Sequence, residues 1–216
     1  MALTKEWRHR IMAWRHELSK HFYQPISQVD LQAGFTFEHY PMEQALETLD
    51  FEPIEPGTGW GSMWEYGWFK GELTIPDFAE GQMIGLMLDV GRETNVTIEV
   101  RDEQMVPIMT QEVAEALVYI NGAYAGAVDN QHNVLILTES AEAGETFSVV
   151  LEAYAGHGPR EWRSGPTPPD RETVPEPPEN QCTVGANHFG VWQEVAFQLA
   201  MDVETLWDLR ETIDSN

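Results

Sequence analysis

The sequence predicts an all-β domain, an antiparallel jelly-roll-like β-sandwich, with a helix at each end of the chain. Three observations lead to this fold class. Apolar and polar residues alternate with a period of two in about eight short segments between residues 28 and 153, the pattern of half-buried strands. No long helical pattern separates these segments, so the crossovers that a parallel sheet needs are missing. The 216 residues, 42% hydrophobic and 22% charged, are enough for one domain with an extension.

The N-terminal segment, residues 1–25, is predicted to form an amphipathic helix. Trp7, Ile11, Trp14 and Leu18 recur at helical spacing, and most of the basic residues lie off this stripe. The helix is expected to end before the proline that closes the segment. Packing on its own domain or on a neighbour is the favoured role. Binding to a membrane surface is disfavoured, because the acidic remainder of the chain would be repelled by anionic lipid.

Residues 26–155 are predicted to form the sandwich. Its strands are expected at residues 28–37, 69–75, 84–90, 96–101, 117–120, 134–137 and 147–153. Asn121-Gly122 follows one of these strands and favours positive φ at both central positions of a type I′ turn, so a hairpin is expected there. Short strands joined by turns favour antiparallel pairing.

The pattern changes twice after the sandwich. Residues 156–180 are rich in proline and glycine and are expected to form an extended strap. Residues 181–216 are predicted to hold a final strand, because apolar residues alternate from Val195 to Val203, and then the start of a helix from Leu206.

The net charge narrows the choice of partners. Twelve Lys and Arg against 36 Asp and Glu give −24 at pH 7, whereas the first twenty residues hold five basic and two acidic side chains. Nucleic acid is not expected as a partner, because binding a polyanion starts from a basic surface. A Lys-poor, acidic surface favours a halophilic protein from a salty cytoplasm, in which screening relieves the repulsion between carboxylates.

The sequence has no local motif for catalysis or metal binding. Neither Cys-x-x-Cys nor His-Glu-x-x-His occurs, and there is no Gly-x-Ser-x-Gly elbow, phosphate loop or dinucleotide fingerprint. The single cysteine, Cys182, excludes an internal disulfide and lies in an acidic, Pro-rich stretch, where an inert thiol is expected. We therefore expect no catalytic residue, metal ligand or cofactor in this chain.

The sequence also predicts a cytoplasmic location and no membrane partner. No apolar run is long enough to cross a bilayer, and basic residues interrupt the N-terminal segment where a secretory signal would be apolar. One cysteine in the whole chain fits a reducing compartment.

Aromatic side chains are the features that favour carbohydrate binding, because their faces stack on sugar rings. They gather between residues 60 and 69, interleaved with glycine. The candidate ring and hydrogen-bonding contacts to carbohydrate are Trp64, Tyr66, Tyr124, His132 and Trp162. Packing at one end of the sandwich is the alternative role of the rings. Trp68 falls on the outward side of its strand, which predicts either a surface platform or a contact with another domain.

Several segments occur in a recognisable order. They read PGTGWG (56–61), WFKGELTIP (68–76), LDVG (88–91), ALVYING (116–122) and EAYAGHG (152–158), flanked by EWRHR (6–10), RETVPEPP (171–178) and DVETL (202–206). In this order they resemble the N-terminal β-sandwich of α-mannosidases of glycoside hydrolase family 38, most closely the bacterial and cytosolic-type branch. The resemblance implies a galactose-binding-domain-like jelly roll. The sequence departs from that family between Arg92 and Glu115, where the segment is longer than the corresponding connection and is expected to add a strand or a rim loop.

The resemblance implies a function as well. In that family a divalent metal, usually zinc, and an Asp nucleophile act in a following catalytic domain, and this chain is expected to stop before that domain. We therefore expect a non-catalytic N-terminal domain that supports the catalytic domain of an α-mannosidase and contributes to carbohydrate contact. Two alternatives are an independent module that binds mannose-containing carbohydrate and a structural domain that forms a homo-oligomer through its terminal helices.

The acidic surface predicts a strong effect of salt on stability. We expect the thermal unfolding midpoint to rise between about 0.1 M and about 1 M NaCl, because the Debye length falls from about 10 Å to about 3 Å and carboxylate repulsion is screened. Calorimetry measures the midpoint, and an uncharged osmolyte at matched osmolality is the control. An unchanged midpoint in salt would contradict the halophilic interpretation.

Overall fold

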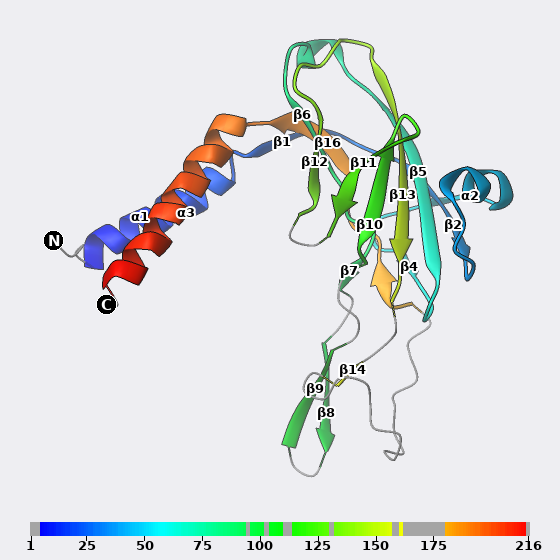
Figure 1. Cartoon of the computed structure of the whole chain (residues 1–216), viewed down its shortest axis with the longest axis horizontal. Helices are drawn as coiled ribbons and strands as arrows, with labels where there is room; N and C mark the ends of the chain where they lie inside the picture. Colours follow the sequence, from blue (N-terminus) through cyan, green and yellow to red (C-terminus); the bar gives the residue numbers. More distant parts are fainter. Residues whose placement is uncertain are drawn as a thin grey trace.

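Two antiparallel sheets pack face to face around one apolar core, and a pair of helices projects from one side of them (Figure 1). The structure is a computed structural model, and it describes residues 5–93, 96–101, 104–109, 114–129, 132–156, 160–161 and 180–214. The arrangement confirms the predicted antiparallel sandwich with a helix at each end.

The first sheet has four strands and joins the two ends of the chain. In spatial order they are β1 (Tyr23–Gln28), β16 (His188–Trp192), β6 (Ile84–Met87) and β12 (Val134–Thr138). Tyr23 of β1 pairs with Trp192 of β16. Because β1 follows the first helix and β16 precedes the last one, this pairing brings the two terminal helices out of the sheet side by side.

The second sheet has six strands. In spatial order they are β11 (Ala123–Val128), β10 (Ala116–Ile120), β13 (Thr146–Tyr154), β5 (Tyr66–Thr74), β2 (Leu31–Thr36) and β3 (Glu52–Ile54). At its centre, β5 and β13 pair over nine residues without a bulge. The turn between β10 and β11 has φ of 50° at Asn121 and 78° at Gly122, which confirms the predicted hairpin.

The core lies between the two sheets. Phe69 and Leu151 contribute from the six-stranded sheet, and Leu86 and Phe189 contribute from the four-stranded sheet. All four side chains are at most 4% exposed. Burial of one such side chain stabilises the fold by roughly 1.5–3 kcal/mol. This core therefore holds the two sheets together.

The structure also contains two small sheets and a single-turn helix. One sheet contains β4 (Gly59–Trp60), β15 (Cys182–Thr183) and β7 (Arg92–Glu93), and the other contains β8 (Val96–Arg101), β9 (Gln104–Met109) and β14 (Arg160–Glu161). The 3-10 helix η1 (Asp77–Ala79) precedes β6. The β8–β9 hairpin extends away from the two main sheets (Figure 1) and lies in the Arg92–Glu115 segment, where an added strand or rim loop was predicted. Most of the predicted strap, residues 157–159 and 162–179, lies outside the described residues.

A short helix, α2 (Met42–Thr48), covers part of the outer face of the six-stranded sheet. Its Ala45 packs in one cluster with Trp68 and Val150, and Trp68 is completely buried. The prediction that Trp68 is a surface platform or a contact with another domain is therefore wrong. Trp68 does point outward from the sheet, but its own chain covers it. The sequence did not predict α2, because seven residues with one buried alanine carry too little periodicity.

The terminal helices are α1 (Lys5–Ser19) and α3 (Glu194–Asp214), and they lie antiparallel, with both chain ends at the far tip (Figure 1). α1 confirms the predicted N-terminal helix. The strand predicted from Val195 to Val203 is wrong, because α3 already begins at Glu194. The alternating apolar residues also meet a helical spacing, and the alanines and glutamine between them favour a helix. Packing against α1 then decides between the two structures.

Three aromatic rings join the helix pair to the sandwich. The ring centroids of Phe22, Trp192 and Phe197 lie 5.1–6.4 Å from one another. The backbone N–H of Gln193 donates to the carbonyl of Phe22 at 2.8 Å. The cluster therefore fixes the point at which both helices leave the four-stranded sheet. Among the described residues, no helix is long and apolar enough to cross a bilayer.

Candidate functional site

The outer face of the six-stranded sheet carries a row of aromatic and polar side chains beside α2. Because strand side chains alternate, the core residues of β5 and β13 point inward while Tyr66, Glu152 and Tyr154 point outward. Tyr66 lies directly opposite Tyr154 in the β5–β13 register. Their ring centroids are 5.1 Å apart with an interplanar angle of 36°. The two rings thus form one aromatic surface at this end of the sheet.

Polar groups adjoin the Tyr66–Tyr154 pair. The imidazole of His39 lies 5.2 Å from the Tyr66 ring, and its Nε2 lies 2.9 Å from Glu152 Oε1. The Tyr119 hydroxyl donates to Glu152 Oε2 at 3.3 Å. The Glu152 side chain is only 11% exposed, whereas that of His39 is 68% exposed. A hydrogen-bonding carboxylate and an accessible imidazole therefore stand beside two aromatic rings, the combination that binds sugar hydroxyls and sugar faces.

The row continues from Tyr119 to Tyr124, whose ring centroids are 6.1 Å apart. Tyr124 is 62% exposed. Burial, with a smaller contribution from the Glu152 carboxylate, raises the pKa of the Tyr119 hydroxyl, so this hydroxyl remains a donor well above neutral pH.

The structure brings two of the five predicted carbohydrate contacts, Tyr66 and Tyr124, to this outer face. Trp64 lies in the loop before β5, half exposed and with a positive φ of 71°. His132 lies in the connection from β11 to β12, where its Nδ1 is 3.2 Å from Asp129 Oδ2. Trp162 lies outside the described residues.

Sequence reasoning missed His39, Tyr119, Glu152 and Tyr154 as members of the row. A signal was present for two of them, because Glu152 takes an outward position of the strand predicted at residues 147–153, and Tyr154 continues the same alternation one residue beyond it. Nothing in the sequence placed His39 beside them, because its position depends on the loop between β2 and α2. Tyr119 needed the register of β10 against β13.

The outer face of the four-stranded sheet is apolar. Ile136 of β12 lies opposite Gly85 of β6, and Val134 lies opposite Met87. A Cβ atom added to Gly85 would lie 3.1 Å from Val134 and 3.4 Å from the ring of Tyr23, so these groups share one face. Ile136 is 40% exposed. This face therefore carries several apolar side chains and is partly open at Ile136.

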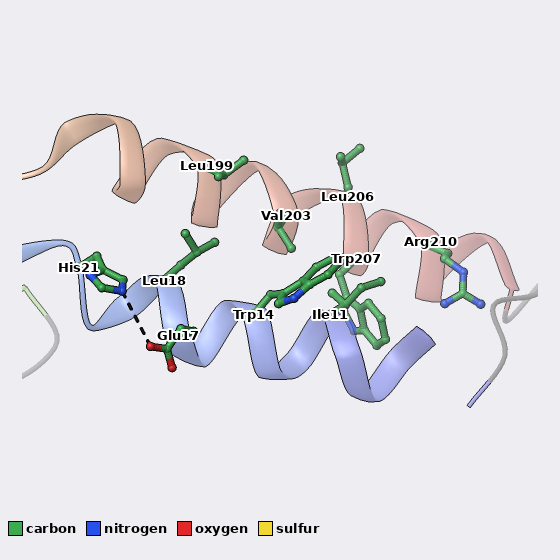
Figure 2. Close-up of a pocket in the computed structure, with 10 residues that line it drawn as sticks. All are labelled: Ile11, Trp14, Glu17, Leu18, His21, Leu199, Val203, Leu206, Trp207 and Arg210. Atoms are coloured by element: carbon green, nitrogen blue, oxygen red, sulfur yellow. Dashed lines mark ion pairs between the residues drawn. The ribbon is translucent and has the colours of Figure 1, made fainter. Parts of the chain in front are cut away.

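A third feature is a groove of about 820 Å³ between α1 and α3 (Figure 2). Its lining residues are Ile11, Trp14, Glu17, Leu18 and His21 from the N-terminal part and Leu199, Val203, Leu206, Trp207 and Arg210 from α3. Most of the lining is apolar. Polar groups stand at its two ends, where His21 Nε2 lies 3.8 Å from a Glu17 carboxylate oxygen and Arg210 lies near the tip. Arg15 of α1 forms an ion pair with Glu204 of α3.

Cys182 lies in the interior of the small sheet that joins β4, β15 and β7. Its thiol is 1% exposed, and burial raises its pKa to about 12. The thiolate is the nucleophilic form, so this thiol is inert at neutral pH. No group of three His, Cys, Asp or Glu side chains that could hold a metal ion occurs within the part of the chain that the structure describes.

The family assignment agrees with this geometry. The model of the α-mannosidase jelly roll domain matches residues 24–176, which is more than half of the chain. The chain therefore belongs to the α-mannosidases of glycoside hydrolase family 38, as an N-terminal jelly roll domain. A search of curated proteins found no match.

Two solved β-glucuronidase structures are similar to parts of this chain. A β-glucuronidase from an uncultured Clostridium species has a TM-score of 0.42 and 10% identity, covering 79% of this chain and 29% of that chain. The β-glucuronidase of Ruminococcus gnavus has a TM-score of 0.37 and 12% identity, covering 62% of this chain and 22% of that chain. The chain thus spans less than a third of the length of these enzymes.

The buried thiol gives a direct test of this part of the structure. At pH 8 we expect Cys182 to be unreactive toward a soluble disulfide reagent, because its raised pKa and burial leave almost no accessible thiolate. In denaturant one thiol per chain reacts, which is the internal control. Rapid reaction of the native chain would contradict the buried position.

Proposed function

We propose that this chain is the non-catalytic domain that supports the catalytic domain of an α-mannosidase. The match of residues 24–176 to the jelly roll domain of that family is the observation that carries the proposal. The resemblance to that family implies that the catalytic chemistry and the metal ion belong to the catalytic domain. The role of this chain is to present a folded surface against which that domain packs.

We infer that the supporting surface is the outer face of the four-stranded sheet. Tyr23, Val134 and Ile136 supply its apolar side chains, and His188 adds a polar group beside Tyr23. Interfaces between domains of one chain combine an apolar centre with a polar rim. The outer face of the six-stranded sheet is less suitable, because α2 and the aromatic row already occupy it.

The proposal is tested with the catalytic domain of a family 38 α-mannosidase that is expressed without its own jelly roll domain. We expect this chain alone to release no p-nitrophenol from p-nitrophenyl α-mannoside, and to raise the melting temperature of the catalytic domain on mixing. Ile136→Glu should abolish that rise, because it places a charge in the apolar contact.

The matched control is Leu117→Glu, on the outer face of the other sheet and 39% exposed. It should leave the rise in melting temperature intact. Mannosidase activity of the chain alone would overturn the non-catalytic role, and an equal effect of both variants would overturn the choice of surface.

A second candidate function is carbohydrate contact, favoured by the Tyr66–Tyr154 pair beside His39 and Glu152. The two rings offer a surface for the apolar face of a pyranose, and the two polar groups offer hydrogen-bond partners for its hydroxyls. Tyr124 extends the row at its exposed end. Mannose-containing carbohydrate is the ligand that the family membership favours.

Isothermal titration with mannose, a series of mannobioses and galactose tests this function. We expect saturable heat with a mannoside and a loss of affinity of at least about tenfold in Tyr66→Ala, because the stacking surface is removed. Phe78→Ala is the control, since Phe78 is 75% exposed and lies in η1, outside the row. Absence of heat at millimolar sugar, or equal loss in both variants, would remove this function.

We also propose that the chain works in a reducing, salty cytoplasm. Its single cysteine is buried and unpaired, and its net charge of −24 is tolerated best where salt screens the carboxylates. The salt dependence of the unfolding midpoint tests the second part of this proposal.

A further inference from the structure

The helix pair is not needed to complete the sandwich. The core clusters contain residues of both sheets and of α2 but none from α1 or α3. Within α1, every described residue is at least partly exposed. The sandwich therefore does not cover the apolar side chains of α1 and α3. Figure 1 shows the helix pair projecting away from the sandwich.

The exposed apolar side chains lie along both helices. Trp14 is 57% exposed on α1, and Leu199 and Leu206 are 50% and 65% exposed on α3. All three line the groove between the helices. Large apolar patches on a protein surface mark contact sites. Two antiparallel helices with an open apolar groove between them have the arrangement of one half of a four-helix bundle.

The two helices carry opposite net charges. α1 has four Lys or Arg and two Asp or Glu, whereas α3 has six Asp or Glu and one Arg. The ion pair of Arg15 with Glu204 shows this attraction inside one chain. An apolar groove between a basic and an acidic helix can pair with a second copy of itself. A two-fold rotation places the basic helix of one copy over the acidic helix of the other.

We propose that the groove between α1 and α3 is filled by a second copy of this chain. The two helix pairs form an antiparallel four-helix bundle, with the basic α1 of each protomer over the acidic α3 of its partner. The two-fold axis runs parallel to the helices. With this axis all neighbouring helices are antiparallel, as in an up-down-up-down bundle. A two-fold axis perpendicular to the helices would instead place α1 over the α1 of the partner and α3 over its α3, so that like charges would meet.

The symmetry also determines the register. A rotation about an axis parallel to the helices leaves each residue at its own level along the bundle. Arg15 and Glu204 share a level within one chain, so Arg15 and the partner's Glu204 share it across the interface. The inference goes beyond the proposed function and is independent of it, because a dimer can form with or without a catalytic domain.

Sedimentation velocity of the full chain between about 1 and 100 µM tests the proposal. We expect a species of twice the chain mass of 24.5 kDa. Leu206→Glu should shift the chain to the monomer with an unchanged melting profile of the sandwich, because it puts a charge on the exposed apolar lining of the groove. Val195→Glu is the matched control, since Val195 is 83% exposed on the same helix but does not line the groove.

Two outcomes would overturn the proposal. A monomer at the highest concentration would show that a second copy of the chain does not fill the groove. A dimer that survives Leu206→Glu would place the contact on another surface.

Cross-linking tests the arrangement of the helices. Ile11 of α1 and Leu206 of α3 both line the groove and are at least partly exposed, and the only native thiol, Cys182, is buried. We expect a short bismaleimide to join an Ile11→Cys chain to a Leu206→Cys chain more often than either chain to itself. Predominant joining of identical chains would overturn the placement of α1 over α3.

Discussion

The nine-residue antiparallel pairing of β5 and β13 is the constraint on which the rest of the structure depends. Each residue of these strands has its face set by the register, from Tyr66 opposite Tyr154 to Thr74 opposite Thr146. In this register Phe69 and Leu151 enter the core, and Tyr66 and Glu152 face outward. A slip by one residue would exchange the two sets, so that aromatic and acidic groups would meet Leu86 and Phe189 of the other sheet. Stability of the core and the identity of the outer surface thus follow from the same set of hydrogen bonds.

The pairing of β1 with β16 has a comparable role for the ends of the chain. These strands are separated by most of the sequence, and their register brings Tyr23 opposite Trp192. The helices that precede β1 and follow β16 therefore leave the sheet together, and Phe22, Trp192 and Phe197 close the junction. α1 and α3 meet because of where their neighbouring strands lie. Their own contact is then completed by the groove residues and the Arg15–Glu204 pair.

The parts of the fold that could be predicted from the sequence are those with a clear local period. The alternation in β5 and β13, the stripe of α1 and the Asn121-Gly122 turn were all correctly identified. The residues from Val195 to Val203 satisfied two periods at once, and only the contact with α1 selects the helix. Trp68 illustrates a further limit, because the outward direction of its side chain was predictable, but the cover that α2 places over it was not. The candidate site was the least predictable part, because His39 and Glu152 are 113 residues apart in the sequence and come together only through the order of the strands.

The distribution of polar and apolar surface over the domain explains how one sandwich can serve several contacts. The core between the sheets is closed, so neither outer face and neither terminal helix is required to cover it. The four-stranded sheet is left with an apolar outer face at Val134 and Ile136, and the six-stranded sheet with aromatic and hydrogen-bonding groups around Glu152. A net charge of −24 disfavours nonspecific association of such surfaces with one another. The helix pair is the exception, because the basic α1 stands beside the acidic α3. The α1 of one copy can therefore attract the α3 of another, whereas the acidic surfaces elsewhere on the two copies repel each other.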